Sequence, residues 1–215
     1  GLGQLTINFQ PLFDTAGGRH LGAEVLLRWN HPEKGSISPA TFIPLAEATG
    51  QIVAIGDWVL EQACRSWSAW HNAGIDPGFL AINVSRVQFR KRLSARIAEL
   101  MSNYRIPSQA LELEITESVL LDDHSQVAEE LGSLRAAGLI LSLDDFGTGY
   151  SSLSYLKRFR FDVLKIDRSF VNGLPDDRDD VLLVKAILAM AKGFDLKVVA
   201  EGVENQQQLS FLENQ

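Results

Sequence analysis

The sequence has a single cysteine, Cys64, among its 215 residues. One thiol cannot form an intrachain disulfide, so a disulfide-stapled fold is excluded and a reducing compartment is expected. Cys64 stands in an apolar helical stripe with Leu60, Ala63 and Trp67, a pattern typical of a core side chain. We therefore expect this thiol to pack rather than to act as a nucleophile.

Long apolar runs and an excess of basic residues are also lacking. The most apolar late stretch, residues 181–191, is short and contains Lys185, and the N-terminus has no secretory signal pattern. The 20 Lys and Arg against 27 Asp and Glu give a formal charge of −7, which argues against binding of DNA or RNA polymers. We expect a cytoplasmic domain, with any membrane anchor elsewhere in a longer parent protein.

The chain does have enough apolar sequence for one large core. Its residues are 46% hydrophobic and 22% charged, and we predict one globular domain over residues 1–215. Short β-branched and aliphatic runs alternate with longer amphipathic runs, which is typical of βα units around a parallel sheet. The predicted strands are residues 7–12, 22–29, 80–84, 111–116, 140–144, 163–166 and 197–200.

Two of the intervening segments have clear helical end signals. Residues 57–72 begin at the acidic Asp57 and end before Gly74, and residues 122–137 end before Gly138. An acidic first turn and a glycine after the last turn are common at helix ends. Both segments are therefore predicted to be helices that cover the sheet.

Polar side chains recur at the carboxyl ends of the predicted strands. In a parallel α/β barrel these ends meet at one mouth, so we expect a shared site there. Helix capping by each acidic residue is the alternative, but Glu114 lies in an apolar run, where a charge needs a partner or a metal. The polar set is Glu24, Asn83, Glu114, Asp144, Asp145, Lys165 and Glu201.

Five carboxylates and one amide oxygen form a hard ligand set, which favours Mg²⁺ or Mn²⁺ over zinc. The histidines His20, His31, His71 and His124 show no metal-ligand spacing and are interpreted as surface or loop residues. These residue types therefore predict a magnesium or manganese site rather than a zinc site.

The adjacent Asp144 and Asp145 would point to opposite faces of a regular strand, so both can serve one site only if the chain leaves strand geometry there. Gly147 makes such a turn plausible. Two metals bridged by a carboxylate could hold a phosphodiester and activate water. Lys165 could hold that water or a phosphate oxygen, Arg28 could pair with phosphate, and Glu201 could be a ligand or a base.

The motifs resemble those of a known bacterial family. Residues 22–29, GAEVLLRW, resemble the signature of EAL domains, with Val25 at the middle position and the pattern of Glu24, Leu26 and Arg28 retained. Ordered similarity covers nearly the whole chain and is a strong signal. The further matching segments are residues 42–47, 83–85, 114–117, 144–152, 164–167 and 200–204.

The resemblance implies a fold and an activity. The fold would be a modified (β/α)₈ TIM-type barrel with an antiparallel first strand, and the activity would be hydrolysis of cyclic di-GMP to linear pGpG with two Mg²⁺ or Mn²⁺ ions. Lys165 is similar to the family lysine at the attacking water, Glu201 to the general base, and Leu26 and Arg28 to substrate contacts. The implied metal ligands are Glu24, Asn83, Glu114 and Asp144 for one ion and Asp144, Asp145 and Glu201 around the other.

Three further expectations come from the same resemblance. Glu117 and Glu204 would steady the loop of residues 145–152, and a homodimer would form through residues 150–159, for which ordinary helix core is the alternative. The chain stops at Gln215, before the closing strand that the family carries, so we expect either a C-terminus that has been cut or a barrel that lacks its closing unit. Fusion to a GGDEF or sensor domain is expected in the parent protein.

Two other functions stay open. A catalytically weak or inactive module could bind cyclic di-GMP as a sensor, although such modules usually lack several of the ligand residues. A barrel lyase of the enolase type also places acidic ligands and a lysine base at strand ends. Adjacent aspartates followed by Gly147 and Gly149 fit phosphate chemistry better than an enolate.

Overall fold

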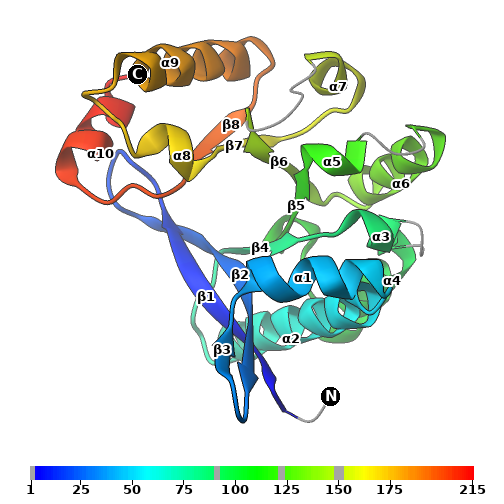
Figure 1. Cartoon of the computed structure of the whole chain (residues 1–215). Helices are drawn as coiled ribbons and strands as arrows, with labels where there is room; N and C mark the ends of the chain where they lie inside the picture. Colours follow the sequence, from blue (N-terminus) through cyan, green and yellow to red (C-terminus); the bar gives the residue numbers. More distant parts are fainter. Residues whose placement is uncertain (1–2, 90–92, 121–123, 148–152) are drawn as a thin grey trace.

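The computed structural model describes residues 3–89, 93–120, 124–147 and 153–215. Its main feature is an eight-stranded sheet that curls into an open half-barrel (Figure 1). The strands are β1 (Leu5–Phe13), β2 (His20–His31), β3 (Gly35–Ile37), β4 (Phe79–Asn83), β5 (Leu111–Thr116), β6 (Ile140–Phe146), β7 (Val163–Ile166) and β8 (Lys197–Ala200).

The strand order is β1-β2-β4-β5-β6-β7-β8, with β3 paired to β2 at the side. β1 runs antiparallel to β2, whereas every pair from β2–β4 to β7–β8 is parallel. The predicted barrel-type sheet with an antiparallel first strand is therefore confirmed. Parallel pairing brings the carboxyl ends of β2 and β4–β8 to one rim, the edge at which α/β barrels build their sites.

Helices connect the parallel strands and lie outside the sheet (Figure 1). The 3₁₀ turn Ser108–Ala110 leads into β5. Among the described residues, no helix is long and apolar enough to cross a bilayer. The helices are α1 (Pro39–Ala48), α2 (Ile52–Asn72), α3 (Arg86–Phe89), α4 (Leu93–Tyr104), α5 (Glu117–Leu120), α6 (His124–Ala136), α7 (Leu153–Arg158), α8 (Arg168–Val171), α9 (Arg178–Gly193) and α10 (Gln206–Glu213).

All seven predicted strands are present, with ends that differ by no more than two residues. β3 was not predicted, because three residues that include Gly35 carry no readable alternation. The helix predicted over residues 57–72 is α2, and its predicted start at Asp57 is wrong, since α2 begins at Ile52. Ile52 and Val59 are both buried, so the apolar stripe already begins about one turn before Asp57. The helix therefore includes that turn as well.

The predicted core role of Cys64 is confirmed. Its side chain is fully buried in α2, beside Leu60 and Ala63. Burial raises the pKa of the Cys64 thiol to about 12, because the thiolate would lose its hydration there. At neutral pH Cys64 is therefore a protonated, inert packing group.

The inner face of β5 carries two buried acids, Glu112 and Glu114, because alternate residues of a strand share a face. Glu112 lies farther from the rim than Glu114 does. Burial raises the pKa of Glu112 to about 7, and nearby Ser142, Lys165 and Lys197 only partly offset that rise. The fold therefore favours the neutral form of this carboxyl.

This burial predicts a pH-dependent stability. A carboxyl with an ordinary pKa of 4.5 in the unfolded chain and about 7 in the fold holds its proton more tightly when folded. Stability is then fully present below pH 4.5 and is lost as pH rises through 7, by about 3 kcal/mol at most. Glu112→Gln should remove this loss, so urea denaturation should show the variant more stable than wild type at pH 8 and similar at pH 5.

The matched control is Glu129→Gln on the exposed face of α6, which should leave the pH profile of stability unchanged. A Glu112→Gln protein that is less stable than wild type at pH 8 would contradict the interpretation. Such a result would mean that Glu112 is ionised and favourably paired in the fold.

Candidate active site

The ammonium of Lys165, on β7, lies at the centre of a carboxylate cluster at the rim. Its side chain is 2% exposed. Nζ lies 2.6 Å from Glu114 Oε1 and 2.6 Å from Glu201 Oε1. It lies 3.3 Å from Asp144 Oδ1 and 3.7 Å from Glu24 Oε2. Side chains from β2, β5 and β6 and from the end of β8 therefore converge on one cation.

Asn83, the last residue of β4, connects two of these carboxylates. Its Nδ2 donates to Glu24 Oε1 at 2.9 Å and to Glu114 Oε2 at 2.7 Å. The next backbone N–H, that of Val84, donates to the Glu114 carbonyl oxygen at 3.0 Å. Asn83 is thus held against β5 and lies within the cluster that the sequence predicted.

The chain leaves regular strand geometry at Asp145, as predicted. The pairing of β6 with β7 shifts between Leu143 and Phe146, and Asp145 has φ 54°, in the left-handed region. Its backbone N–H donates to Asp144 Oδ1 at 3.0 Å. A non-glycine residue held at positive φ is uncommon and is typical of functional sites, because the surrounding structure must stabilise it.

Burial and like charge determine the protonation of the cluster. Burial raises the pKa of Glu114 well above its usual range, Lys165 opposes that rise, and Glu24 and Asp144 add to it. Burial also raises the pKa of Glu201, again opposed by Lys165. For Lys165 burial acts to lower the pKa, but the surrounding carboxylates outweigh it and raise the pKa. Lys165 is therefore firmly charged.

The cluster has more negative than positive charge. The Lys165 ammonium faces four carboxylates, those of Glu24, Glu114, Asp144 and Glu201. A buried excess of carboxylate is costly unless further cations or protons neutralise it. The donor set is all oxygen once the Asn83 amide turns its oxygen inward, and this fits Mg²⁺ or Mn²⁺.

As the side chains stand, the described residues contain no group of three or more His, Cys, Asp or Glu arranged to hold a metal ion. The Lys165 ammonium fills the space among the carboxylates, and Asn83 presents its nitrogen to them. Metal binding would therefore require Lys165 and Asn83 to readjust.

The predicted substrate contacts lie beside the cluster. Glu24, Leu26 and Arg28 alternate along β2 and share one face. Leu26 and Arg28 line a cavity of about 320 Å³ that also reaches Asn83 and Thr116. Arg28 donates through Nη1 to the Leu27 carbonyl oxygen at 2.9 Å.

The two residues predicted to steady the loop after Asp145 lie in different surroundings. Glu117 Oε1 accepts the Gly147 N–H at 3.3 Å, so it does contact the described part of that loop. Glu204 is 65% exposed and pairs with Arg168 at 3.6 Å. Residues 148–152 lie outside the described residues, so the loop prediction stays a prediction.

The predicted dimer segment, residues 150–159, is described only from residue 153, where α7 begins. Leu156 and Phe159 are buried in the core cluster. Their burial favours a core role for these two side chains, Leu156 within α7 and Phe159 directly after it.

The histidines lie away from the cluster where the structure describes their contacts. His31 Nδ1 accepts the N–H groups of Glu33 and Lys34 in a turn, and the His71 ring stacks on Trp67. His20 is exposed on β2 next to Phe13.

Sequence reasoning missed two polar residues beside the site, Glu47 and Ser85. Ser85 Oγ donates to Glu47 Oε1 at 2.6 Å, and both residues line the cavity that reaches Asn83. Both fall in segments that matched the family motifs, residues 42–47 and 83–85. Nothing in the sequence indicated that they meet, because α1 and β4 are far apart along the chain.

Comparison with known proteins identifies close relatives. The chain is 44% identical over 210 residues to the bifunctional diguanylate cyclase/cyclic di-GMP phosphodiesterase MucR of Pseudomonas aeruginosa, covering 97% of this chain and 31% of MucR. It is 43% identical over 210 residues to the cyclic di-GMP phosphodiesterase NbdA of the same organism, covering 97% of this chain and 27% of NbdA. The chain thus spans about a third or less of the length of these two relatives.

Solved structures agree with the sequence comparison. The MucR phosphodiesterase in complex with c-di-GMP superposes with a TM-score of 0.91 at 44% identity, over 98% of this chain and 86% of that one. The EAL enzyme Bd1971, bound to cAMP and cyclic di-GMP, superposes with a TM-score of 0.93 at 30% identity, over 99% of this chain and 58% of that one. The EAL domain family model matches residues 1–214, and the chain belongs to the EAL domain family.

Proposed function

We propose that this chain hydrolyses cyclic di-GMP to linear pGpG and that it needs Mg²⁺ or Mn²⁺ to do so. The main support is the convergence of Glu24, Glu114, Asp144 and Glu201 on Lys165 at the rim. Relatives at 43% and 44% identity are cyclic di-GMP phosphodiesterases by name. Residues 1–215 are proposed to form one catalytic domain.

The proposed metal ligands are the oxygen donors of the cluster: Glu24, Asn83, Glu114 and Asp144 for one ion, and Asp144, Asp145 and Glu201 for a second. When bound, two such ions would activate water and neutralise charge that develops on the phosphoryl oxygens. They would also supply the positive charge that an anionic substrate needs beside this group of carboxylates.

The remaining roles belong to side chains of the chain itself. Lys165 can donate hydrogen bonds to a phosphoryl oxygen or to the attacking water, and Arg28 can pair with the second phosphate. Glu201, whose pKa is raised by burial, can accept the proton of that water. The water oxygen forms a new bond to phosphorus, and the bond to the 3′ oxygen breaks. That oxygen takes up a proton from solvent and leaves as a hydroxyl, while Glu201 holds the proton of the attacking water.

Leu26 and the cavity of about 320 Å³ are proposed to hold a nucleoside part of the substrate. Apolar side chains such as Ile43, Ile52 and Ile55 line this cavity and can pack on a planar base. We also propose a homodimer through residues 150–159, in which Leu156 and Phe159 belong to the core and other residues of the segment form the contact. We further propose a parent protein with a GGDEF or sensor domain, a proposal supported by the bifunctional name of MucR.

The activity is tested by incubating the protein with cyclic di-GMP and Mg²⁺ or Mn²⁺ and separating the products by chromatography. We expect pGpG, and none in the presence of a chelator. Glu201→Gln should lower kcat by about 100-fold or more, the typical contribution of a positioned base, while cyclic di-GMP still binds. Glu213→Gln, on the exposed end of α10, is the control and should leave kcat unchanged.

Two results would contradict this function. Tight binding of cyclic di-GMP without cleavage, with either metal present, would instead support a sensor. A protein that cleaves neither cyclic di-GMP nor the generic phosphodiester bis(p-nitrophenyl) phosphate, with either metal present, would instead fit the lyase alternative, because a lyase should leave both untouched.

The charge excess makes a second prediction about stability. In chelator, Lys165→Met should lower the free energy of unfolding by about 3 kcal/mol or more, because the buried carboxylates lose their cation. Added Mn²⁺ should stabilise the variant more than wild type, because a metal ion then neutralises the same carboxylates. Urea denaturation with chelator and with Mn²⁺ measures both effects.

Lys192→Met, at the exposed end of α9, is the matched control and should show neither effect. The interpretation fails if Lys165→Met is as stable as wild type in chelator, or if Mn²⁺ stabilises wild type more than the variant.

A further inference from the structure

A hydrogen bond connects helix α1 to the turn that follows Asn83. Ser85 Oγ donates to Glu47 Oε1 at 2.6 Å, across 38 residues of sequence. Hydrogen bonds to an ionised acceptor are shorter and stronger than neutral ones. Ser85 lies two residues beyond Asn83, so this contact acts on the backbone that carries the proposed metal ligand.

The turn is held at several other points. The Ser85 N–H donates to Gln88 Oε1 at 3.0 Å, and the Val87 N–H donates to Ser85 Oγ at 3.3 Å. Gln88 is buried against Gly56 of α2, where a Cβ atom would lie 2.1 Å from Gln88 Nε2. Of these contacts, only the Glu47 carboxylate comes from α1.

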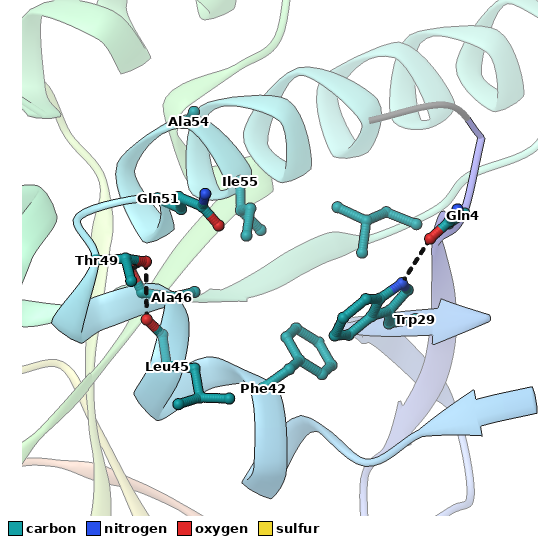
Figure 2. A pocket seen from close by; sticks show the side chains of 10 residues that line it. Gln4, Trp29, Phe42, Leu45, Ala46, Thr49, Gln51, Ala54 and Ile55 are labelled. Carbon is teal, nitrogen blue, oxygen red and sulfur yellow. Dashed lines mark hydrogen bonds between the residues drawn. The ribbon is translucent and has the colours of Figure 1, made fainter. Parts of the chain in front are cut away.

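Helix α1 lies between two cavities. Its Ile43 and Glu47 line the cavity of about 320 Å³ beside Asn83. Figure 2 shows its other side, where Phe42, Ala46 and Thr49 face a cavity of about 410 Å³. Phe42 and Ala46 are the buried residues of this helix. Phe42 and Ala46 hold α1 against the body of the protein, and the hydrogen bond between Glu47 and Ser85 connects α1 directly to the turn.

We propose that Glu47 is a positioning residue, which acts through Ser85 to hold Asn83 where it can serve as a metal ligand. This inference rests on the proposed function. Glu47 need not touch the metal or the substrate: it fixes the Ser85 hydroxyl, the hydroxyl fixes the turn, and the turn sets the direction of the Asn83 side chain. Partners that orient ligands typically contribute 10- to 100-fold to metal affinity or activity, as an order of magnitude.

A direct role for Glu47 in substrate binding is the competing explanation, since Glu47 also lines the cavity proposed for a nucleoside. The two roles differ in what Ser85 does. If Glu47 acts through Ser85, removal of either partner has the same effect and removal of both adds little. If Glu47 binds substrate, the two effects are independent and add.

The test compares Glu47→Ala, Ser85→Ala, their double variant and Glu47→Gln. Mn²⁺ binding is measured by calorimetry without substrate, and kcat and KM for cyclic di-GMP are measured at several Mn²⁺ concentrations. Glu47→Ala and Ser85→Ala should each weaken Mn²⁺ binding by about 10-fold or more, and the double variant should be no weaker. Glu47→Gln should bind Mn²⁺ more tightly than Glu47→Ala does, because its amide oxygen can still accept the hydrogen bond from the Ser85 hydroxyl.

Thr49→Ala is the matched control. Thr49 Oγ1 donates to the Leu45 carbonyl oxygen at 2.8 Å, so this variant also removes a side-chain hydrogen bond from α1 but on the side away from Ser85. It should bind Mn²⁺ as wild type does. Thermal melting of every variant checks that the fold is kept.

Three results would overturn the proposal. The first is Mn²⁺ binding by Glu47→Ala within about two-fold of wild type, well below the contribution expected of an orienting partner. The second is a raised KM in Glu47→Ala with no change in Ser85→Ala, which would assign Glu47 to the substrate. The third, wild-type protein that binds no Mn²⁺, would overturn the proposed function as well, whereas the first two leave it standing.

Discussion

The site depends on one buried cation, the ammonium of Lys165, which holds together carboxylates that would otherwise repel each other. Nζ lies within 2.6 Å of both Glu114 and Glu201 and within 3.7 Å of Glu24. These carboxylates come from different strands, so the ion pairs also fix the strands at the rim. The Coulomb energy of such contacts must offset the desolvation of every charge involved, and a pair that lost its partner would be costly. The cluster is therefore a structural centre of the rim as well as the proposed reactive site.

The sheet topology explains why the charges meet where they do. Parallel pairing from β2 to β8 brings the carboxyl ends of the strands to one rim, and strand alternation selects which side chains face inward. The side chains of adjacent strand residues point to opposite faces, so Asp144 and Asp145 could not both face the site from a regular strand. At Asp145 the pairing register shifts and the backbone takes a positive φ. Loops and short helices then close around the rim, and among them the turn after Asn83 is tied to α1 through Glu47.

Much of this arrangement could be predicted from the sequence, since it follows from local patterns. Short apolar runs indicated the strands, and polar residues at their ends indicated Glu24, Asn83, Glu114, Asp144, Lys165 and Glu201, which the structure brings together. Three-dimensional contacts could not be read in this way. The central position of Lys165, the depth to which Glu112 is buried and the contact between Glu47 and Ser85 depend on how distant segments pack, which strand periodicity does not specify. The start of α2 was misplaced because an acidic residue inside a helix resembled a helix cap.

The most direct measurement is a crystal structure of the protein grown with Mn²⁺, with the metal located by its anomalous scattering. If the carboxylate cluster is a metal site, the peaks should lie among Glu24, Asn83, Glu114 and Asp144, with the Asn83 oxygen turned inward and the Lys165 ammonium displaced from the centre. Manganese bound elsewhere, with Lys165 still in contact with Glu114 and Glu201, would contradict this interpretation.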